Sequence, residues 1–182
     1  APTTATLRVF TFKRGLLAAV GHDLRLSFGR FSGTAEDGHV TVEVATDSLT
    51  VDGAMGRNGQ LEPLSRLYTA EIEANARGPK VLDCARFPRA RFEGDALPDR
   101  RRIRGTLALR GRRTDVDGTL EIADLHACAV FEFAPSRCGI PPFRAMAGAL
   151  KLQDRVRVEA EVTWPEGPAP THLTFTGPGG PA

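Results

Sequence analysis

Strict alternation of apolar and polar residues is the feature that most constrains this chain. Over residues 154–164, DRVRVEAEVTW, apolar residues occupy every second position from Val156 to Trp164, and charged residues or threonine stand between them. Successive side chains of a β-strand point to opposite faces. The segment therefore predicts an antiparallel strand with one buried face and one solvated face.

The same alternation recurs in seven other segments, so about eight strands are expected in total. They lie at residues 6–12, 23–28, 39–45, 89–94, 102–110, 118–124 and 128–134. Turn-forming residues separate them at Gly15 and at residues 36–39, 94–99, 110–111 and 115–118. A set of short antiparallel strands removes its exposed edges by closing on itself, which favours a closed barrel or a sandwich.

Two segments depart from the alternation. Between Pro63 and about Arg77, apolar residues recur at helical spacing, and a Gly-Pro pair follows as a stop signal. After Trp164 the chain is rich in proline and glycine, which is typical of an extended or disordered tail. We therefore expect one barrel domain over residues 5–164 and a Pro/Gly-rich extended tail over residues 165–182.

His22 and Asp23 form the most reactive-looking dipeptide, because a histidine beside a carboxylate is a common general base. If both residues lie in a strand, however, their side chains point to opposite faces and cannot form a dyad with each other. The sequence also lacks a G-x-S-x-G nucleophile elbow. We interpret His22 as a residue held by a hydrogen bond at a strand end. The alternatives are ligand contact and a hydrolase-like enzyme that uses His22.

The spacing of histidine and cysteine does not predict a metal site. The sequence has no H-x-H, H-E-x-x-H or C-x-x-C pattern. His126 and Cys128 would share a strand face, yet a stable zinc site needs at least three protein ligands. We expect no metal and no cofactor. The odd number of cysteines, Cys84, Cys128 and Cys138, predicts reduced thiols rather than a disulfide framework.

Arginine is concentrated in one segment, DRRRIRGTLALRGRRTDVDG. The segment contains Arg100, Arg101, Arg102, Arg104, Arg110, Arg112 and Arg113. It fits either an anion patch that makes transient contact with an anionic membrane surface, or a solvated strand face in which aspartates alternate with arginines. We favour the solvated face and keep membrane contact through Arg100–Arg113 as a prediction. A net charge of only +2 and the lack of an aromatic-interleaved recognition motif argue against a nucleic-acid partner.

The N-terminal sequence APTTATLRVF has no basic region followed by an apolar block, so a cytoplasmic protein is expected. A periplasmic protein from which a signal peptide has been removed is the alternative. No apolar run approaches the roughly 20 residues that a membrane-spanning helix needs. A homodimer is a further hypothesis that the sequence leaves open.

Several of the ten phenylalanines lie on predicted strands. An eight-stranded barrel has an interior large enough for its own side chains or for one small ligand. These phenylalanines therefore either fill a core or line a ligand tunnel, and the alternation alone does not separate the two interpretations.

Four stretches of the sequence, in this order, resemble the YceI-like polyisoprenoid-binding family. They are TFKRGLLAAVGHDLRLSFGRFSGTA, ARFPRARFEG, RIRGTLALRGRRTDVDGTLEI and CGIPPFRAMAGALKLQDRVRVEAEVTW. The shared features are basic and small residues before V-G-[FH], a strand ending near F-x-G, a helix-containing insertion, a G-x-L-x-[IL]-R-G segment and a final alternating strand. The similarity covers about residues 5–164. The stretch EANARGPKVLDCARFP departs from the family, which often has H-L-x-S-x-x-F-F-D there.

The resemblance implies an all-β fold, a lipocalin-like eight-stranded antiparallel β-barrel with one short helical insertion. It also implies a non-enzymatic protein that binds or carries a long apolar amphiphile in the barrel lumen, such as a polyisoprenoid, a quinone or a fatty-acid-like lipid. A filled barrel that acts as an interaction module through its arginine segment is the alternative. The strand faces and the resemblance together predict these ligand-binding residues: Phe10, His22, Leu24, Leu26, Phe28, Val42, Phe92, Leu107, Ala129, Phe131, Phe133, Phe143 and Met146.

Overall fold

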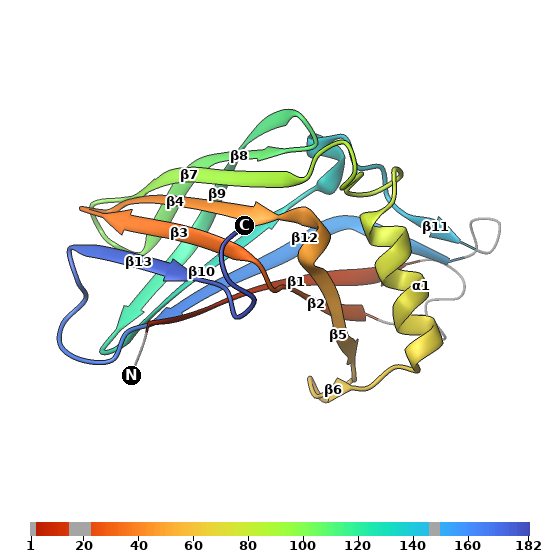
Figure 1. Ribbon diagram of the computed structural model, residues 1–182, viewed down its shortest axis with the longest axis horizontal. Coiled ribbons are helices and arrows are strands. Elements are labelled where there is room, and N and C mark those ends of the chain that lie inside the picture. The colour runs from red at the N-terminus through yellow and green to blue at the C-terminus, as the bar shows by residue number, and fades with distance from the viewer. Residues whose placement is uncertain (1–2, 15–22, 146–149) are drawn as a thin grey trace.

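One antiparallel sheet, rolled into a barrel, dominates the computed structural model of the chain (Figure 1). The structure describes residues 3–14, 23–145 and 150–182. Its strands are β1 (Thr4–Arg14), β2 (Asp23–Phe28), β3 (Phe31–Glu36), β4 (His39–Ala45), β5 (Leu49–Met55), β6 (Leu61–Glu62), β7 (Arg89–Ala96), β8 (Arg102–Leu109), β9 (Arg112–Ala123), β10 (His126–Phe133), β11 (Arg144–Ala145), β12 (Leu150–Thr163) and β13 (His172–Thr176). The helix α1 (Arg66–Arg77) and two short 3-10 turns, η1 (Thr46–Ser48) and η2 (Pro135–Cys138), lie between strands.

Eight strands form the ring of the barrel, because two of them are bent. Strand β2 continues into β3 through Gly29 and Arg30, and β4 continues into β5 through η1. A hydrogen bond of 3.2 Å from the Gly29 N–H to the Ser48 carbonyl oxygen keeps the two bent strands paired. Strand β2 pairs with β1, β4 pairs with β7, and β7-β8-β9-β10-β12-β1 completes the ring. The lipocalin-like barrel predicted from the sequence is thereby confirmed.

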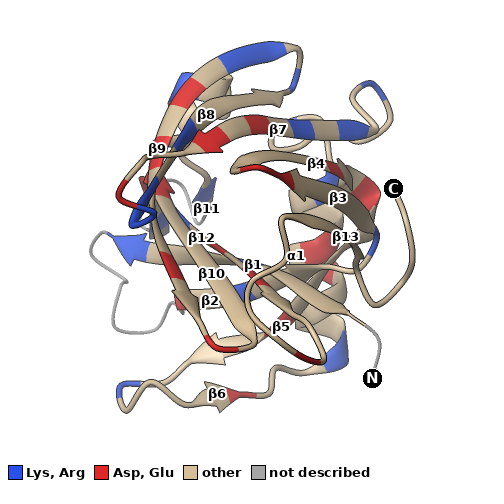
Figure 2. Cartoon of the chain, turned by 90° about the vertical axis from the view of Figure 1, so that its left-hand side faces the viewer, with Lys and Arg blue, Asp and Glu red and all other residues tan. Residues whose placement is uncertain are grey.

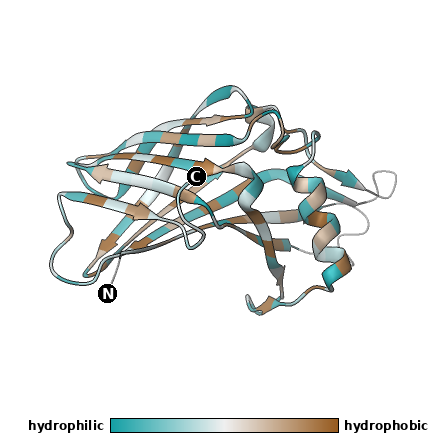
Figure 3. Cartoon of the chain, viewed as in Figure 1, coloured by the Kyte–Doolittle hydropathy of each residue, from teal (hydrophilic) through white to brown (hydrophobic). Residues whose placement is uncertain are grey.

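The alternation places most strands correctly, and it is visible as alternating hydropathy along the ribbon in Figure 3. Strands β2 and β4 have the predicted bounds, whereas β12 starts at Leu150 rather than at residue 154. The predicted turn at residues 115–118 is wrong, since these residues lie within β9. Asp117 there faces solvent and accepts a hydrogen bond from Arg104 of β8 at 2.7 Å. An aspartate that is typical of turns thus serves as a cross-strand partner.

Helix α1 covers one end of the barrel (Figure 1). It begins after Ser65, whose hydroxyl accepts a hydrogen bond from the Tyr68 N–H at 3.3 Å, and so starts later than the predicted Pro63. The Glu73 carboxylate accepts a hydrogen bond from the Val51 N–H of β5 at 2.9 Å, which fixes the helix to the sheet. Among the described residues, no helix is both long and apolar enough to cross a lipid bilayer.

The C-terminal segment adds a strand to the barrel. Strand β13 pairs with β3, so the folded unit extends past the predicted boundary at residue 164. The free edge of β3 offers unpaired backbone donors and acceptors, and β13 satisfies them. The ring of Phe175 packs over Gly33, where a Cβ atom would lie 2.4 Å from that ring. Only glycine leaves room for this contact, so the tail is matched to the strand it covers.

Candidate ligand-binding site

An apolar cavity of about 360 Å³ lies inside the barrel. Its wall comes mainly from strands β1, β2, β4, β7, β8, β10 and β12, and from α1 and the segments that follow α1 and η2. Most wall residues are aliphatic or aromatic. Small-molecule pockets have volumes of about 300–1,000 Å³, so the interior has room for part of a ligand rather than only for its own side chains.

The cavity occupies the end of the barrel that α1 covers, and the other end is filled. On β8, Leu107 and Leu109 line the cavity, whereas Ile103 belongs to a buried cluster farther along the strand. On β10, Phe133 lines the cavity, whereas Ala129 packs against the same buried cluster. The inward residues thus form a wall near α1 and a plug at the opposite end.

Two phenylalanines form the part of the wall nearest the plug. The rings of Phe92 and Phe131 meet edge to face with 5.2 Å between centroids. The Phe92 ring lies over the cross-strand pair Gly94 and Gly105, where Cβ atoms would be 2.7 Å and 2.8 Å from the ring. Gly118 gives Phe131 the same kind of space, at 2.7 Å. Glycine therefore lets both rings lie flat against the sheet and leaves the lumen beside them open.

Nine of the predicted ligand-binding residues lie in the cavity wall. They are Leu24, Leu26, Phe28, Val42, Phe92, Leu107, Phe131, Phe133 and Phe143. The structure thus brings together side chains from five strands and one loop. Their contact with a ligand stays a prediction.

Four predicted residues are not in this wall. Phe10 points outward, because Leu7 and Val9 take the inward positions of β1, and the Arg157 guanidinium lies 6.0 Å from its ring centroid. Ala129 faces inward but belongs to the plug. His22 and Met146 lie outside the described residues.

Sequence reasoning missed the part of the wall contributed by α1 and the loops. Tyr68, Ile72 and Ala76 recur at a spacing of four residues and present one helix face to the cavity. Val81 and Leu82 follow from the connection to β7. The helical spacing of Tyr68, Ile72 and Ala76 is a signal that could have predicted them. No pattern in the sequence around Val81 and Leu82 marks these two as wall residues.

The described ionisable groups do not assemble a catalytic or metal centre. A hydrogen bond from Arg104 lowers the pKa of Asp117, and one from Arg155 lowers the pKa of Glu132. Burial, followed by nearby glutamates, raises the pKa of the Cys128 thiol. These shifts favour charged carboxylates and a protonated thiol, which suits neither a general acid nor a nucleophile. Among the described residues, no three His, Cys, Asp or Glu side chains are grouped to hold a metal ion.

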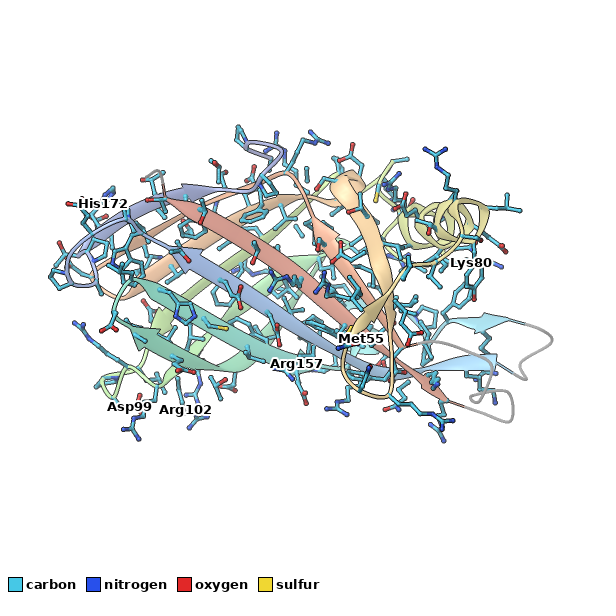
Figure 4. The ribbon with its side chains drawn as sticks, turned by 90° about the horizontal axis from the view of Figure 1, so that it is seen from below. Met55, Lys80, Asp99, Arg102, Arg157 and His172 are labelled. Carbon is cyan, nitrogen blue, oxygen red and sulfur yellow. The ribbon has the colours of Figure 1, made fainter. Side chains whose placement is uncertain are left out.

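The seven arginines of residues 100–113 do not form one patch. They are spread along the antiparallel pair β8 and β9. Arg102 lies 3.9 Å from Asp117, while Arg110 donates to backbone carbonyls just after α1, next to Lys80. Figure 4 shows Arg102 and Lys80 at opposite ends of the molecule, and Figure 2 shows both signs of charge along the outer strands. The structure favours a solvated, charge-alternating face.

Comparisons with known proteins agree with this architecture. The family model described as the YceI-like domain matches residues 3–164. Among solved structures, BcnA of Burkholderia cenocepacia has a TM-score of 0.56 at 12% identity, covering 88% of this chain and 96% of that chain. A variant of the Campylobacter jejuni YCEI protein with a monobromobimane guest has a TM-score of 0.53 at 11% identity, with 78% and 85% covered. No curated protein matches the chain. At these identities the structural likeness shows the fold alone.

Proposed function

The chain belongs to the YceI-like domain family, and we propose that it binds or carries a long apolar amphiphile in the barrel cavity without catalysing a reaction. The ligand is a polyisoprenoid, a quinone or a fatty-acid-like lipid. The apolar wall of the cavity, closed at one end by the plug, is the observation that carries the proposal.

Hydrophobic transfer accounts for such binding. Each methylene group moved from water into an apolar environment contributes about 0.8 kcal/mol, so a long chain needs few polar contacts. The wall near the plug is made of residues such as Val42, Phe92 and Phe131, which offer no hydrogen bonds from their side chains. Polar side chains such as Lys13, Lys151 and Gln153 lie instead toward the α1 end. A chain would therefore enter with its tail toward the plug and its head toward α1.

Two other functions receive less support from the structure. A barrel that acts only as an interaction module needs no cavity, yet one of about 360 Å³ is present. A hydrolase-like reaction needs a nucleophile near a base, and the described wall contains no serine, cysteine or histidine. The Thr46 hydroxyl in the wall already donates to the Phe87 carbonyl oxygen at 2.7 Å.

Mass spectrometry of an organic extract of the purified protein tests the proposal. We expect a long-chain lipid at a stoichiometry near one per protein chain. The delipidated protein should then bind an added chain such as hexadecan-1-ol or a polyprenol. An extract free of lipid, together with no binding of the added chains, would contradict the proposal.

A further inference from the structure

The cavity ends at the same level on opposite sides of the barrel. On β1, Leu7 lines the cavity, whereas the next inward residue, Ala5, belongs to a buried cluster and does not line it. On β8, which lies opposite β1 in the ring of eight strands, Leu107 lines the cavity and the next inward residue, Gly105, does not. Beyond Gly105, Ile103 is only 3% exposed. The cavity therefore has a floor, and the barrel is packed beyond it.

Two aromatic rings close the barrel at this floor. Phe92 on β7 and Phe131 on β10 line the cavity, and their rings meet edge to face with 5.2 Å between centroids. The Phe92 ring extends over Gly94 and Gly105, and the Phe131 ring extends over Gly118. Glycine has no side chain that could fill the lumen. At these positions the two rings therefore supply the bulk that separates the cavity from the packed residues beyond.

The cavity above this floor is short. On β1 its lining extends from Leu7 to Lys13. A strand that rises about 3.3 Å per residue and tilts by about 40° covers about 15 Å of the barrel axis over this interval. The length of a bound chain is limited to about this depth.

The volume of the cavity sets a limit in carbon atoms. An apolar cavity of about 150 Å³ holds one benzene molecule, which has six carbon atoms. At the same packing, the cavity of about 360 Å³ holds about 14 carbon atoms. A fatty-acid-like chain of that size fits entirely, whereas a longer chain must leave its remaining carbon atoms outside the barrel at the α1 end.

We propose that Phe92 and Phe131 determine the length of the chain that the barrel binds. The ligand places a terminal segment of about 14 carbon atoms on this floor, and further carbon atoms add nothing to its affinity. The ligand class that the cavity holds whole is therefore a fatty-acid-like or short prenyl chain of this size. The inference rests on the proposed function, since it sets the chain length for the ligand of the same cavity.

A series of linear alcohols tests the inference on the delipidated protein. The series runs from octan-1-ol to icosan-1-ol, below the aggregation concentration of each member, with calorimetric titration of the shorter alcohols and displacement of decan-1-ol by the longer ones. Each methylene that enters the cavity should tighten binding about fourfold, until the chain has about 14 carbon atoms. Beyond this length limit the affinity should stay constant, because the added methylenes remain in water.

Variants of the floor locate the effect. Phe92→Ala removes one ring, so the length limit should move to longer chains by up to about six carbon atoms, the size of that ring. Val42→Phe adds a ring on β4 directly opposite Phe92 and should move the limit to shorter chains. The second variant tests the inference independently if the first does not fold.

Phe133→Ala is the matched control. Phe133 lines the cavity on the same face of β10 as Phe131 but two residues closer to the α1 end. Its removal should change the affinity for short and long alcohols alike and leave the length limit where it is.

The outcomes separate the two proposals. An affinity of the unmodified protein that keeps rising about fourfold per methylene up to icosan-1-ol would overturn the length limit and leave the lipid container intact. An unchanged limit in each folded floor variant, or an equal shift in Phe133→Ala, would overturn the role of the two rings. Failure of all the alcohols to bind would count against the container itself.

Discussion

At the scale of single residues, Thr11 places a hydroxyl in an aliphatic part of the cavity wall. Its Oγ1 atom is buried and has no hydrogen-bond partner in the part of the chain that the structure describes. The residues opposite it, Val156 on β12 and Leu24 on β2, are apolar. A buried hydroxyl without a partner loses its hydrogen bonds to water and gains none.

Thr11→Val keeps the shape of the side chain and removes this loss. We expect the free energy of unfolding to rise by about 1 kcal/mol, measured by urea unfolding of the delipidated protein. Thr174→Val, on the exposed face of β13, is the control and should change stability little. A lower stability of Thr11→Val would show that the hydroxyl does have a partner.

Cys128 is the described thiol whose acidity is most clearly altered. Burial, and then the charges of Glu161, Glu159 and Glu121, raise its pKa above the ordinary value of 9.0. Because the thiolate is the reactive form, alkylation by iodoacetamide should be slow at pH 8, and the midpoint of its rise with pH should lie above that ordinary value. Glu161→Gln should move the rate profile to lower pH. A profile centred at or below 9.0 in the unmodified protein would refute the assignment.

At the scale of elements, β13 tests whether the C-terminal segment stabilises the barrel. Phe175 is 7% exposed and packs with Ala5, Phe31 and Val44. Phe175→Ala removes this packing and should cost about 3–5 kcal/mol of unfolding free energy. Thr174→Ala on the exposed face should cost far less. Equal melting temperatures for the two variants would show that β13 contributes little to stability.

The sequence predicts elements best where one local pattern decides them. Strands β2 and β4 alternate without interruption, and their bounds match the prediction. Strands β3 and β5 are not predicted, because glycine and acidic residues interrupt their alternation. Gly33 leaves the space that the ring of Phe175 occupies. Gly53 lies at a bulge, where a Cβ atom would be 2.5 Å from the Glu62 carbonyl oxygen. Both requirements come from segments distant in sequence, which no local window contains.

At the scale of the whole molecule, alternation predicts which face of a strand is inward but not how deep a residue lies. It therefore finds Leu107 and Phe133 in the wall and also places Ala129 there, although Ala129 lies in the plug. On β1 even the face is ambiguous, because Val9 and Phe10 are both apolar. The pairing of β1 with β12 and β2 decides in favour of Val9, and arginine covers the outward ring.

Depth along the barrel axis can be tested at three alanines. Ala160 lies in the cavity wall on β12, and Ala129, directly opposite it on β10, lies in the plug. Ala108 on β8 is absent from the wall and lies opposite Arg91 and Arg113 on the outer face. The three residues are identical in size and all lie in strands. The three tryptophan variants therefore differ mainly in the surroundings of the new side chain, which are the cavity, the plug and the outer face.

Ala160→Trp should fill space that the ligand uses, so that the affinity for hexadecan-1-ol falls about tenfold or more while the melting temperature of the ligand-free protein changes little. Ala129→Trp overpacks the plug and should cost about 1–3 kcal/mol of unfolding free energy. Ala108→Trp should change neither quantity, since its side chain enters solvent beside two arginines. Calorimetric titration and thermal melts of the three delipidated variants give both readouts. The contrary outcome is that Ala160→Trp loses as much stability as Ala129→Trp and keeps the affinity for the alcohol. The barrel would then be filled by its own side chains at the position of Ala160 as well as in the plug, and the chain would not be a lipid container.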